Sequence, residues 1–483
     1  MKKIFIIFSL CFWVFILSTS TVVSAWSGDP SVNTPVVTAD ENQSSQKIVY
    51  DGQGGWFIVW HDNRMGSDIY AQYFDADGEA QWAENGIAVC DDSSGQSYPK
   101  VILNGSGGII VSWADGRNDS GDIYAQNLDA EGNNIWTANG VPVIATEEDN
   151  YCGWLVSDGD GGAIVMSHNY DDGEWTGGSV NRINSAGTLP WGTAATPVTY
   201  SSESSSAPKL LSDGSGGAIL VWIDSDTVHQ EIGNIAVQRV DNNGNLLWNC
   251  GVPILITDAD YCMCPRIISD GSDGAIIMWM DERIEYEWME LYIQKINGSG
   301  VAQWTANGVL VTSDDTDSYE SGLASDEEGG AFVTWSDTAD SNVYARRIGS
   351  DGSLLWSGPV QLTTTGDFKG TSDPPRKTVE DGSGGFITGW INDSEEVMVQ
   401  RVDKDGTILW ADNGVVLSNA SGEKDGSRIA GNGEGGAVAV WWDRRNDPED
   451  KDIYMQGVTE DGELFGASDD DSDSNCFISS AIH

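Results

Sequence analysis

The sequence predicts an all-β fold built from eight copies of one small unit. A Gly-Gly pair, followed by an apolar run, recurs with steps of 51 to 57 residues. The second glycine of the pair falls at Gly55, Gly108, Gly162, Gly217, Gly274, Gly330, Gly385 and Gly436. Short β-branched and aromatic runs fill each period, and no segment after the amino-terminal apolar run has a sustained helical periodicity. Units of this length cannot bury their apolar faces alone and must stack on one another.

The second unit shows how each repeat is expected to fold. Its first strand lies near residues 100–103, and an Asn-Gly-Ser-Gly-Gly turn leads to a β-branched and aromatic strand at residues 109–113. A polar loop separates this strand from the alternating segment 122–128, which ends in an Asp-Ala-Glu-Gly hairpin turn. Residues 135–136 and 141–143 are expected to form a fourth, interrupted strand. Four short antiparallel strands in each of eight units are typical of an eight-bladed β-propeller.

The tryptophans support this prediction, because fourteen of the 21 fall at two repeat positions. One set ends the second strand: Trp60, Trp113, Trp222, Trp279, Trp335, Trp390 and Trp441. The other set follows the third turn's glycine by four residues: Trp82, Trp136, Trp191, Trp248, Trp304, Trp356 and Trp410. Large flat side chains at fixed positions can fill the wedges between twisted neighbouring sheets, so a structural role is expected for both sets.

The eighth unit lacks its last strand, and the missing strand is present at the other end of the chain. Residues 34–38 (Thr-Pro-Val-Val-Thr) have the required pattern. We expect them to complete the last blade, which closes the ring and removes exposed sheet edges. The propeller is expected to span residues 26–466, followed by an acidic tail at 467–483 with a Cys-Phe-Ile end.

Two segments, 128–136 and 402–410, resemble the tryptophan-docking repeats of quinoprotein-type propellers. Those repeats also pair a turn glycine with a tryptophan four residues later, although the turn is one residue shorter here. The resemblance implies an eight-bladed fold. It does not imply the pyrroloquinoline quinone cofactor, because no basic cluster for its three carboxylates is assigned. No cofactor is identified, and Ca²⁺ stays open as a ligand.

The amino terminus predicts export. Lys2 and Lys3 precede an apolar run at residues 4–17, and Val-Ser-Ala ends at Ala25, so residues 1–25 are expected to be a cleaved signal peptide. An extracellular, periplasmic or cell-surface location follows, with no transmembrane segment after the signal. The tail resembles the Cys-Phe-Ile tails of many exported proteins of anaerobic proteobacteria. Surface sorting and a simple disordered end are the two interpretations.

Charge and cysteines narrow the partners and the redox chemistry. With 75 Asp and Glu against 24 Lys and Arg, the formal net charge is −51, which disfavours nucleic acid as a partner. Export permits disulfides, and Cys250 is close enough in sequence to pair with Cys262 or Cys264. The Cys262-Met263-Cys264 run could instead hold a metal, although no histidine is near.

A W-x-D-x-R motif recurs after the second strand of several units. Its acid and base residues are Asp62 with Arg64, Asp115 with Arg117, Asp281 with Arg283, and Asp443 with Arg445. As a functional ring, these residues could bind a polar ligand or Ca²⁺. As structural residues, the aspartate caps the turn and the arginine crosses its hairpin to an acid such as Asp122. Recurrence in half of the units favours the structural interpretation.

Units three to five break the repeat with longer loops that mix aromatic rings and charged groups. The candidate ligand-binding residues there are His168, Tyr170, Trp175, His229, Arg283, Tyr286 and Trp288. This mixture suits stacking on sugar rings or capture of a peptide. The leading hypothesis is a non-catalytic binding or scaffold module for polysaccharide or protein. The alternatives are a polysaccharide hydrolase or lyase using carboxylates of these loops, and a structural adhesion or surface-layer component. The sequence does not set the oligomeric state.

Overall fold

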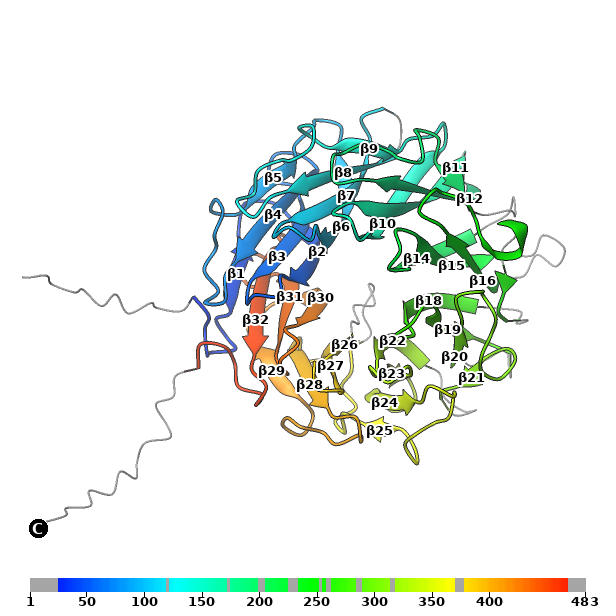
Figure 1. The fold of residues 1–483 in the computed structure, drawn as a ribbon. Coiled ribbons are helices and arrows are strands. Elements are labelled where there is room, and N and C mark those ends of the chain that lie inside the picture. Colours follow the sequence, from blue (N-terminus) through cyan, green and yellow to red (C-terminus); the bar gives the residue numbers. More distant parts are fainter. Residues whose placement is uncertain are drawn as a thin grey trace, which may run out of the picture.

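The computed structural model describes residues 25–118, 121–171, 174–198, 205–224, 233–251, 254–257, 262–283, 289–312, 318–369 and 378–467. Within these residues the chain forms eight four-stranded antiparallel sheets around one axis (Figure 1). The predicted eight-bladed β-propeller is therefore confirmed. A single short 3-10 helix, η1 (Trp248–Gly251), interrupts the described strands.

The strands occupy four positions from the axis outward. Innermost are β2 (Gln43–Tyr50), β6 (Gln96–Leu103), β10 (Asp149–Ser157), β14 (Ser205–Ser212), β18 (Cys262–Ser269), β22 (Ser318–Ser325), β26 (Thr378–Glu380) and β30 (Lys424–Gly431). Second are β3 (Trp56–Asp62), β7 (Ile109–Asp115), β11 (Ala163–Asp171), β15 (Ala218–Asp224), β19 (Ala275–Asp281), β23 (Ala331–Asp337), β27 (Phe386–Ile391) and β31 (Ala437–Asp443).

Third are β4 (Asp68–Phe74), β8 (Asp122–Leu128), β12 (Glu174–Ile183), β16 (Asn234–Val240), β20 (Glu290–Ile296), β24 (Asn342–Ile348), β28 (Val397–Val402) and β32 (Asp452–Val458). Outermost are β5 (Ile87–Cys90), β9 (Val141–Ile144), β13 (Thr196–Pro197), β17 (Ile254–Leu255), β21 (Val309–Leu310), β25 (Val360–Gln361), β29 (Val415–Ser418) and β1 (Thr34–Val37). The outer strand β9 leaves out residues 135–136, which were expected to belong to it.

The apolar core lies between neighbouring blades. The second strands are almost wholly buried, as in β7, where all seven residues are buried. The tryptophans expected at their ends lie one or two residues before the last strand residue and have exposed fractions near zero, with Trp60, Trp113 and Trp279 at 0%. One apolar cluster between blades contains Trp60 of the first blade and Val440 of the last blade. The first tryptophan set therefore fills the space between blades, as predicted.

The second tryptophan set links each blade to the next one. The Nε1 of Trp82 donates to the carbonyl of Ala130 at 3.0 Å, in the third turn of the following blade. Gly132 of that turn has a φ of +83°, and a Cβ there would lie 3.0 Å from the Trp82 ring. The same bond to the next blade is made by Trp136, Trp191, Trp248, Trp304, Trp356 and Trp410. These residues are structural, and no family follows from the contact.

The ring closes through the amino-terminal segment, as predicted. Strand β1 pairs antiparallel with β32, with Thr34 opposite Met455, and completes the last blade. Trp26 supplies the eighth interblade tryptophan, because its Nε1 donates to the carbonyl of Ala76 at 2.9 Å. Its ring also meets Phe465 edge-on at 5.3 Å. Both ends of the described propeller therefore meet at one seam.

A second interblade link, which the sequence did not suggest, uses buried ion pairs. Arg239 on β16 bonds Asp213 of its own blade at 2.9 Å and the carbonyl of Gly298 in the next blade at 3.2 Å. Equivalent links are made by Arg182, Lys295, Arg347 and Arg401. These cations are therefore used for ring assembly.

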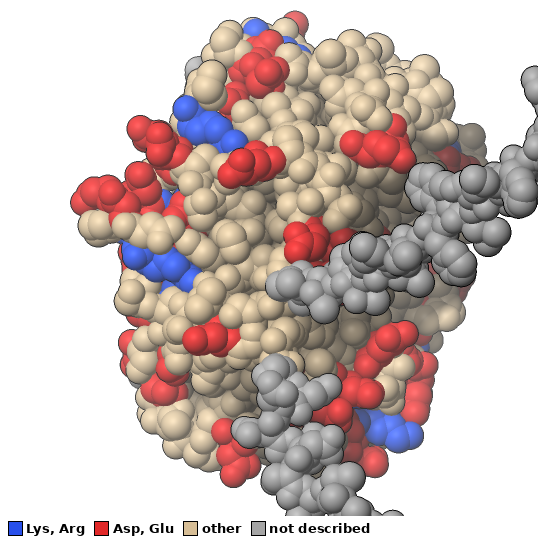
Figure 2. Space-filling model, turned by 90° about the vertical axis from the view of Figure 1, so that its left-hand side faces the viewer, with Lys and Arg blue, Asp and Glu red and all other residues tan. Residues whose placement is uncertain are grey.

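Acidic side chains outnumber basic ones on the side of the propeller that Figure 2 shows. Figure 2 shows Asp and Glu side chains spread over one side of the molecule, with few Lys and Arg among them. No helix among the described residues is long and apolar enough to cross a membrane. The whole chain has 24 Lys and Arg against 75 Asp and Glu.

Candidate ligand-binding site

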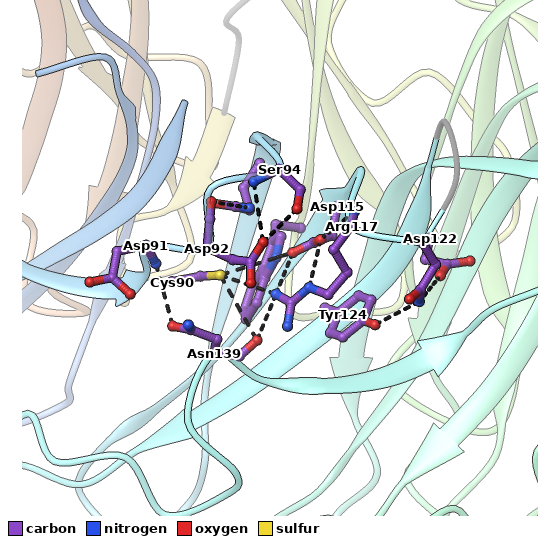
Figure 3. A network of polar contacts seen from close by, with 12 residues as sticks. Cys90, Asp91, Asp92, Ser94, Asp115, Arg117, Asp122, Tyr124 and Asn139 are labelled. Carbon is purple, nitrogen blue, oxygen red and sulfur yellow. Dashed lines mark hydrogen bonds and ion pairs between the residues drawn. The ribbon is translucent and has the colours of Figure 1, made fainter. Parts of the chain in front are cut away.

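The W-x-D-x-R motif forms a buried brace at one end of its blade. In the second blade, Trp113 Nε1 donates to Asp115 at 2.8 Å, and the Arg117 backbone N–H and Nε donate to the same carboxylate at 3.0 and 2.8 Å (Figure 3). The Asp115 side chain is fully buried. The guanidinium carbon lies 4.1 Å from the centre of the Tyr124 ring. The carboxylate thus caps its turn and is neutralised by a charge-assisted pair.

The arginine of the brace also fixes the loop that leads to the outer strand. Arg117 donates to the carbonyl of Asn139 at 2.9 Å. The prediction that Arg117 pairs with Asp122 is wrong, because the Asp122 carboxylate accepts a hydrogen bond from Asn118 Nδ2 at 2.8 Å. A guanidinium two residues after the aspartate reaches back within its own turn. The other braces pair Arg64 with Asp62, Arg283 with Asp281, and Arg445 with Asp443.

Blade 3 replaces this charged brace with neutral groups. Ser167 stands in place of the tryptophan and donates to Asn169 Oδ1 at 2.7 Å. Asn169 Nδ2 donates to Ser179 at 2.9 Å, and Asn150 Nδ2 donates to Asn169 Oδ1 at 3.1 Å. Blade 3 therefore lacks both the indole and the guanidinium that occupy this position in blades 1, 2, 5 and 8.

The inner strand of blade 3 carries a tryptophan between two lysines from its neighbours. Trp154 on β10 is partly exposed. The Nζ of Lys100 on β6 lies 4.8 Å from the ring centre of Trp154, and the Nζ of Lys209 on β14 lies 4.1 Å from it. Both contacts are cation–π interactions. We call Lys100, Tyr151, Trp154, His168, Tyr170 and Lys209 the blade 3 site.

A neutral imidazole and two phenols belong to the same region. His168 on β11 lies opposite Tyr151 in the β10–β11 ladder, and it is only 8% exposed. Burial, with the charges of Lys209 and Lys100, lowers the pKa of His168 to about 3. The Tyr151 and Tyr170 rings meet edge-on at 5.4 Å. The imidazole is thus uncharged at neutral pH and lies within the field of both lysines.

The blade 3 site combines an apolar plane with positive charge. The partly exposed indole offers apolar surface to the CH groups of a pyranose ring, and the ammonium groups over the indole can pair with a carboxylate or sulfate. The site lacks a cluster of acids, and no group of three His, Cys, Asp or Glu residues that could hold a metal ion occurs in the described ranges. An anionic sugar is the ligand that this set of groups suits best.

The candidate residues predicted from sequence divide into three groups. His168 and Tyr170 lie in the blade 3 site. Arg283 lies in the brace of blade 5, where it also bonds the carbonyl of Asn307 at 2.7 Å. His229, Tyr286 and Trp288 lie outside the described residues, as does the side chain of Trp175. For these four residues, ligand binding stays a prediction.

Sequence reasoning missed Lys100, Trp154 and Lys209. These residues lie in inner strands, where the repeat pattern predicts strand position but no function. The signal was present, because each of the three precedes the second glycine of its Gly-Gly pair by eight residues. Aligning the eight repeats on that glycine places them in one column.

Two of the described cysteines, Cys90 and Cys262, have buried thiols whose pKa is raised mainly by burial. Burial is the main reason that the pKa of Cys90 is raised to about 12, so this thiol stays protonated. Cys90, Cys262 and Cys264 are free in the structure. The side chain of Cys250 lies outside the described residues, so the bridge from Cys250 stays a prediction.

Comparisons with known proteins place the chain by shape alone. No protein-family model matches it, and no curated protein matches it. Solved structures with similar shape include polysaccharide lyase Uly1, with 9% identity, a TM-score of 0.47 and coverage of 92% of this chain and 94% of that chain. A PL25 ulvan lyase bound to -[GlcA(1-4)Rha3S]- has 9% identity and a TM-score of 0.43, with coverage of 88% and 96%. An α-L-arabinanase of Penicillium chrysogenum has 10% identity and a TM-score of 0.37, with coverage of 65% and 94%.

Proposed function

We propose that this protein is an exported β-propeller that binds polysaccharide through the blade 3 site. The observation that carries the proposal is Trp154, a partly exposed indole on an innermost strand with a lysine ammonium on each side. Sugar-binding sites commonly use an aromatic plane for stacking and a few polar groups for orientation. Protein as a ligand, and a purely structural adhesion role, have no comparable observation in their favour.

A structural explanation of the Trp154 contacts is weaker. The indole could serve only to hold the two ammonium groups. Lys209 Nζ, however, also donates to the carbonyl of Pro208 at 3.3 Å, so it has an anchor apart from the ring. The tryptophans with structural roles in this fold are different: those at the ends of second strands are buried, and those between blades donate Nε1 to a carbonyl. Trp154 fits neither group.

A lyase acting on a uronate-containing polysaccharide is the second candidate, favoured by His168. In such an elimination, a base takes the proton from C5, a C4–C5 double bond forms, and the C4–O bond breaks with its electron pair leaving on the sugar oxygen, which takes a proton from water. Lysines would neutralise the carboxylate, and a neutral imidazole can accept the proton. Burial keeps the imidazole neutral but leaves only 8% of the residue exposed. Limited access of a substrate proton ranks elimination below binding.

Export is proposed on the amino-terminal sequence. The Lys2-Lys3 pair, the apolar run and the small residues that end at Ala25 support cleavage before Trp26. Trp26, the first residue after this cleavage point, donates Nε1 to the carbonyl of Ala76. The proposal is tested by amino-terminal sequencing of the protein recovered outside the cytoplasm.

The binding proposal is tested with a glycan array on the mature chain, residues 26–483. Trp154→Ala should lose at least tenfold in affinity for the glycan that binds best, and Trp154→Phe should keep much of it because a flat ring remains. Equal melting temperatures of the three proteins show that the fold is intact. Unchanged binding by Trp154→Ala would contradict the proposal.

Turnover is tested on the same glycan. An eliminase produces an unsaturated uronate, which is followed by its ultraviolet absorbance, and His168→Gln should abolish that signal while binding persists. Binding by the native protein without any product identifies a binding module and excludes the lyase for that glycan.

A further inference from the structure

One repeat position concentrates the basic residues of this acidic chain. Eight residues before the second glycine of each Gly-Gly pair stand Lys47, Lys100, Trp154, Lys209, Arg266, Gly322, Lys377 and Arg428. Lys377 lies outside the described residues. Lys and Arg together number 24 among 483 residues, so repeated use of one position is not a consequence of composition. We call Lys47, Lys100, Lys209, Arg266 and Arg428 the axial ring.

The axial ring occupies one level of the propeller. Lys47 pairs with Val59 across the first two strands of its blade, and Arg428 pairs with the equivalent Val440. The residues before and after Lys47 are buried, whereas Lys47 is partly exposed. Strand β2 is covered by β3 and by the inner strands β6 and β30 on either side. Lys47 is therefore partly exposed on one of the inner strands that surround the axis (Figure 1), and the four equivalent residues on their inner strands are partly exposed as well.

The local fold gives these cations a structural contact. Each follows a β-bulge, at which the ladder register shifts. Lys47 Nζ donates to the carbonyls of Ser45 and Gln46 at 2.9 and 3.1 Å. Arg428 NH1 donates to the carbonyls of Gly426 and Ser427 at 3.2 and 2.9 Å. Bulges leave carbonyls outside the ladder, and a cation can satisfy them.

The bulge does not require a cation, however. Blade 3 has the same register shift with Trp154 at this position, and blade 6 has it with Gly322. The same bulged backbone thus accommodates the indole of Trp154 and a glycine, which has no side chain. The bulge itself therefore does not select a basic residue, although five of the seven described positions carry one.

The two lysines beside Trp154 have an electrostatic effect on their surroundings. Burial is the main cause of the lowered pKa of His168 on the neighbouring strand β11, and the charges of Lys209 and Lys100 lower it further, so these two lysines make positive charge less favourable near them. Negative charge is favoured by the same field. The net charge of −51 repels a polyanion from the protein as a whole, so the basic residues of the axial ring are the groups that can attract one.

We propose that the axial ring is a binding site for a polyanionic polysaccharide, whose carboxylate or sulfate groups pair with several of the five cations at once. The proposal deepens the proposed function, since it rests on the blade 3 site for contact with the sugar rings. It adds Lys47, Arg266 and Arg428, which lie on other blades. Several weak ion pairs on one polymer reinforce each other, whereas a small anion meets only one or two.

The test is calorimetric titration of the mature chain with polygalacturonate, dextran sulfate and neutral dextran at low salt. A Lys47→Gln/Arg428→Gln variant removes two ring charges away from Trp154. Its matched control is Lys404→Gln/Arg444→Gln, which removes two charges from exposed or half-buried surface positions. We expect the ring variant to bind a polyanion at least tenfold more weakly, the control to change less than twofold, and neutral dextran not to bind the native protein comparably.

Each outcome has a defined meaning. Binding of only one polyanion supports the ring and identifies carboxylate or sulfate as its ligand group. Equal losses in the ring variant and the control, or no loss in the ring variant, overturn the proposal. Lys47→Arg/Arg428→Lys keeps the charges and should retain binding, which separates loss of charge from a disturbed bulge. Trp154→Ala tests the proposed function independently. If Trp154→Ala binds glycans as well as the native protein, the proposed function is wrong, but a loss of polyanion binding in the ring variant still supports the axial ring.

Discussion

His168 shows how one residue of the blade 3 site depends on its surroundings. The imidazole is buried and lies near two lysines, so its protonated form is disfavoured in the folded protein and its pKa falls from an ordinary 6.5 to about 3. The unfolded chain can bind a proton at a pH where the folded chain does not. Acid therefore favours unfolding through this residue as the pH falls from about 6.5 towards 3.

The first prediction follows from that linkage. His168→Gln keeps a polar side chain of similar length but cannot titrate, so its free energy of unfolding should fall less steeply with acid than that of the native protein. The two proteins should differ by a constant amount above about pH 7, and the difference should shift towards the variant by a few kcal/mol near pH 4. Denaturant unfolding at several pH values measures this. Parallel curves would show that the imidazole is not held neutral.

At the scale of the structural element, the contact between blades rests on a glycine and a tryptophan. Gly352 has a φ of +82°, and a Cβ there would lie 2.7 Å from the Trp304 ring of the preceding blade. Gly271 has a similar φ of +79° but nothing within 4 Å of the added Cβ. The two glycines thus share the backbone requirement and differ in the interblade contact.

The second prediction compares alanine at these two positions. Gly271→Ala should destabilise the protein by about 1 kcal/mol through left-handed backbone strain alone. Gly352→Ala should cost at least about 2 kcal/mol more, because the new methyl group overlaps the indole and forces the blades apart. Thermal and denaturant unfolding measure both values. Equal losses would mean that the tryptophan yields easily and contributes little to blade docking.

The elements were predictable from sequence to different degrees. Strand positions, blade number and the closing strand β1 follow from patterns of glycine, tryptophan and β-branched residues that each repeat displays by itself. The axial ring does not follow from such patterns. Within a single repeat, Lys47 or Arg428 is one basic residue on a strand, and the ring is recognised only when the repeats are aligned with one another. The brace partner was missed for a local reason: a short turn lets Arg117 reach Asp115 more easily than it reaches Asp122.

At the scale of the whole molecule, charge and closure are linked. A net charge of −51 makes the compact state repel itself, and salt screens this repulsion. Contacts between every pair of neighbouring blades oppose this repulsion, and the seam where β1 meets β32 is one of these contacts. The seam alone is made by segments from the two ends of the propeller. Its loss leaves β32 as an open sheet edge.

The third prediction concerns that seam. Removal of residues 26–37 from the mature chain eliminates β1 and Trp26, so the melting temperature should fall sharply and the exposed edge of β32 should promote oligomers in size-exclusion chromatography. Trp26→Ala, which keeps β1, should lose about 3–5 kcal/mol because the indole is only 6% exposed. Removal of residues 468–483 is the control and should change neither measurement, since no described contact is lost. A truncated protein that melts with the native one would show that the ring holds without its closing strand, and that the interblade tryptophans and ion pairs are sufficient by themselves.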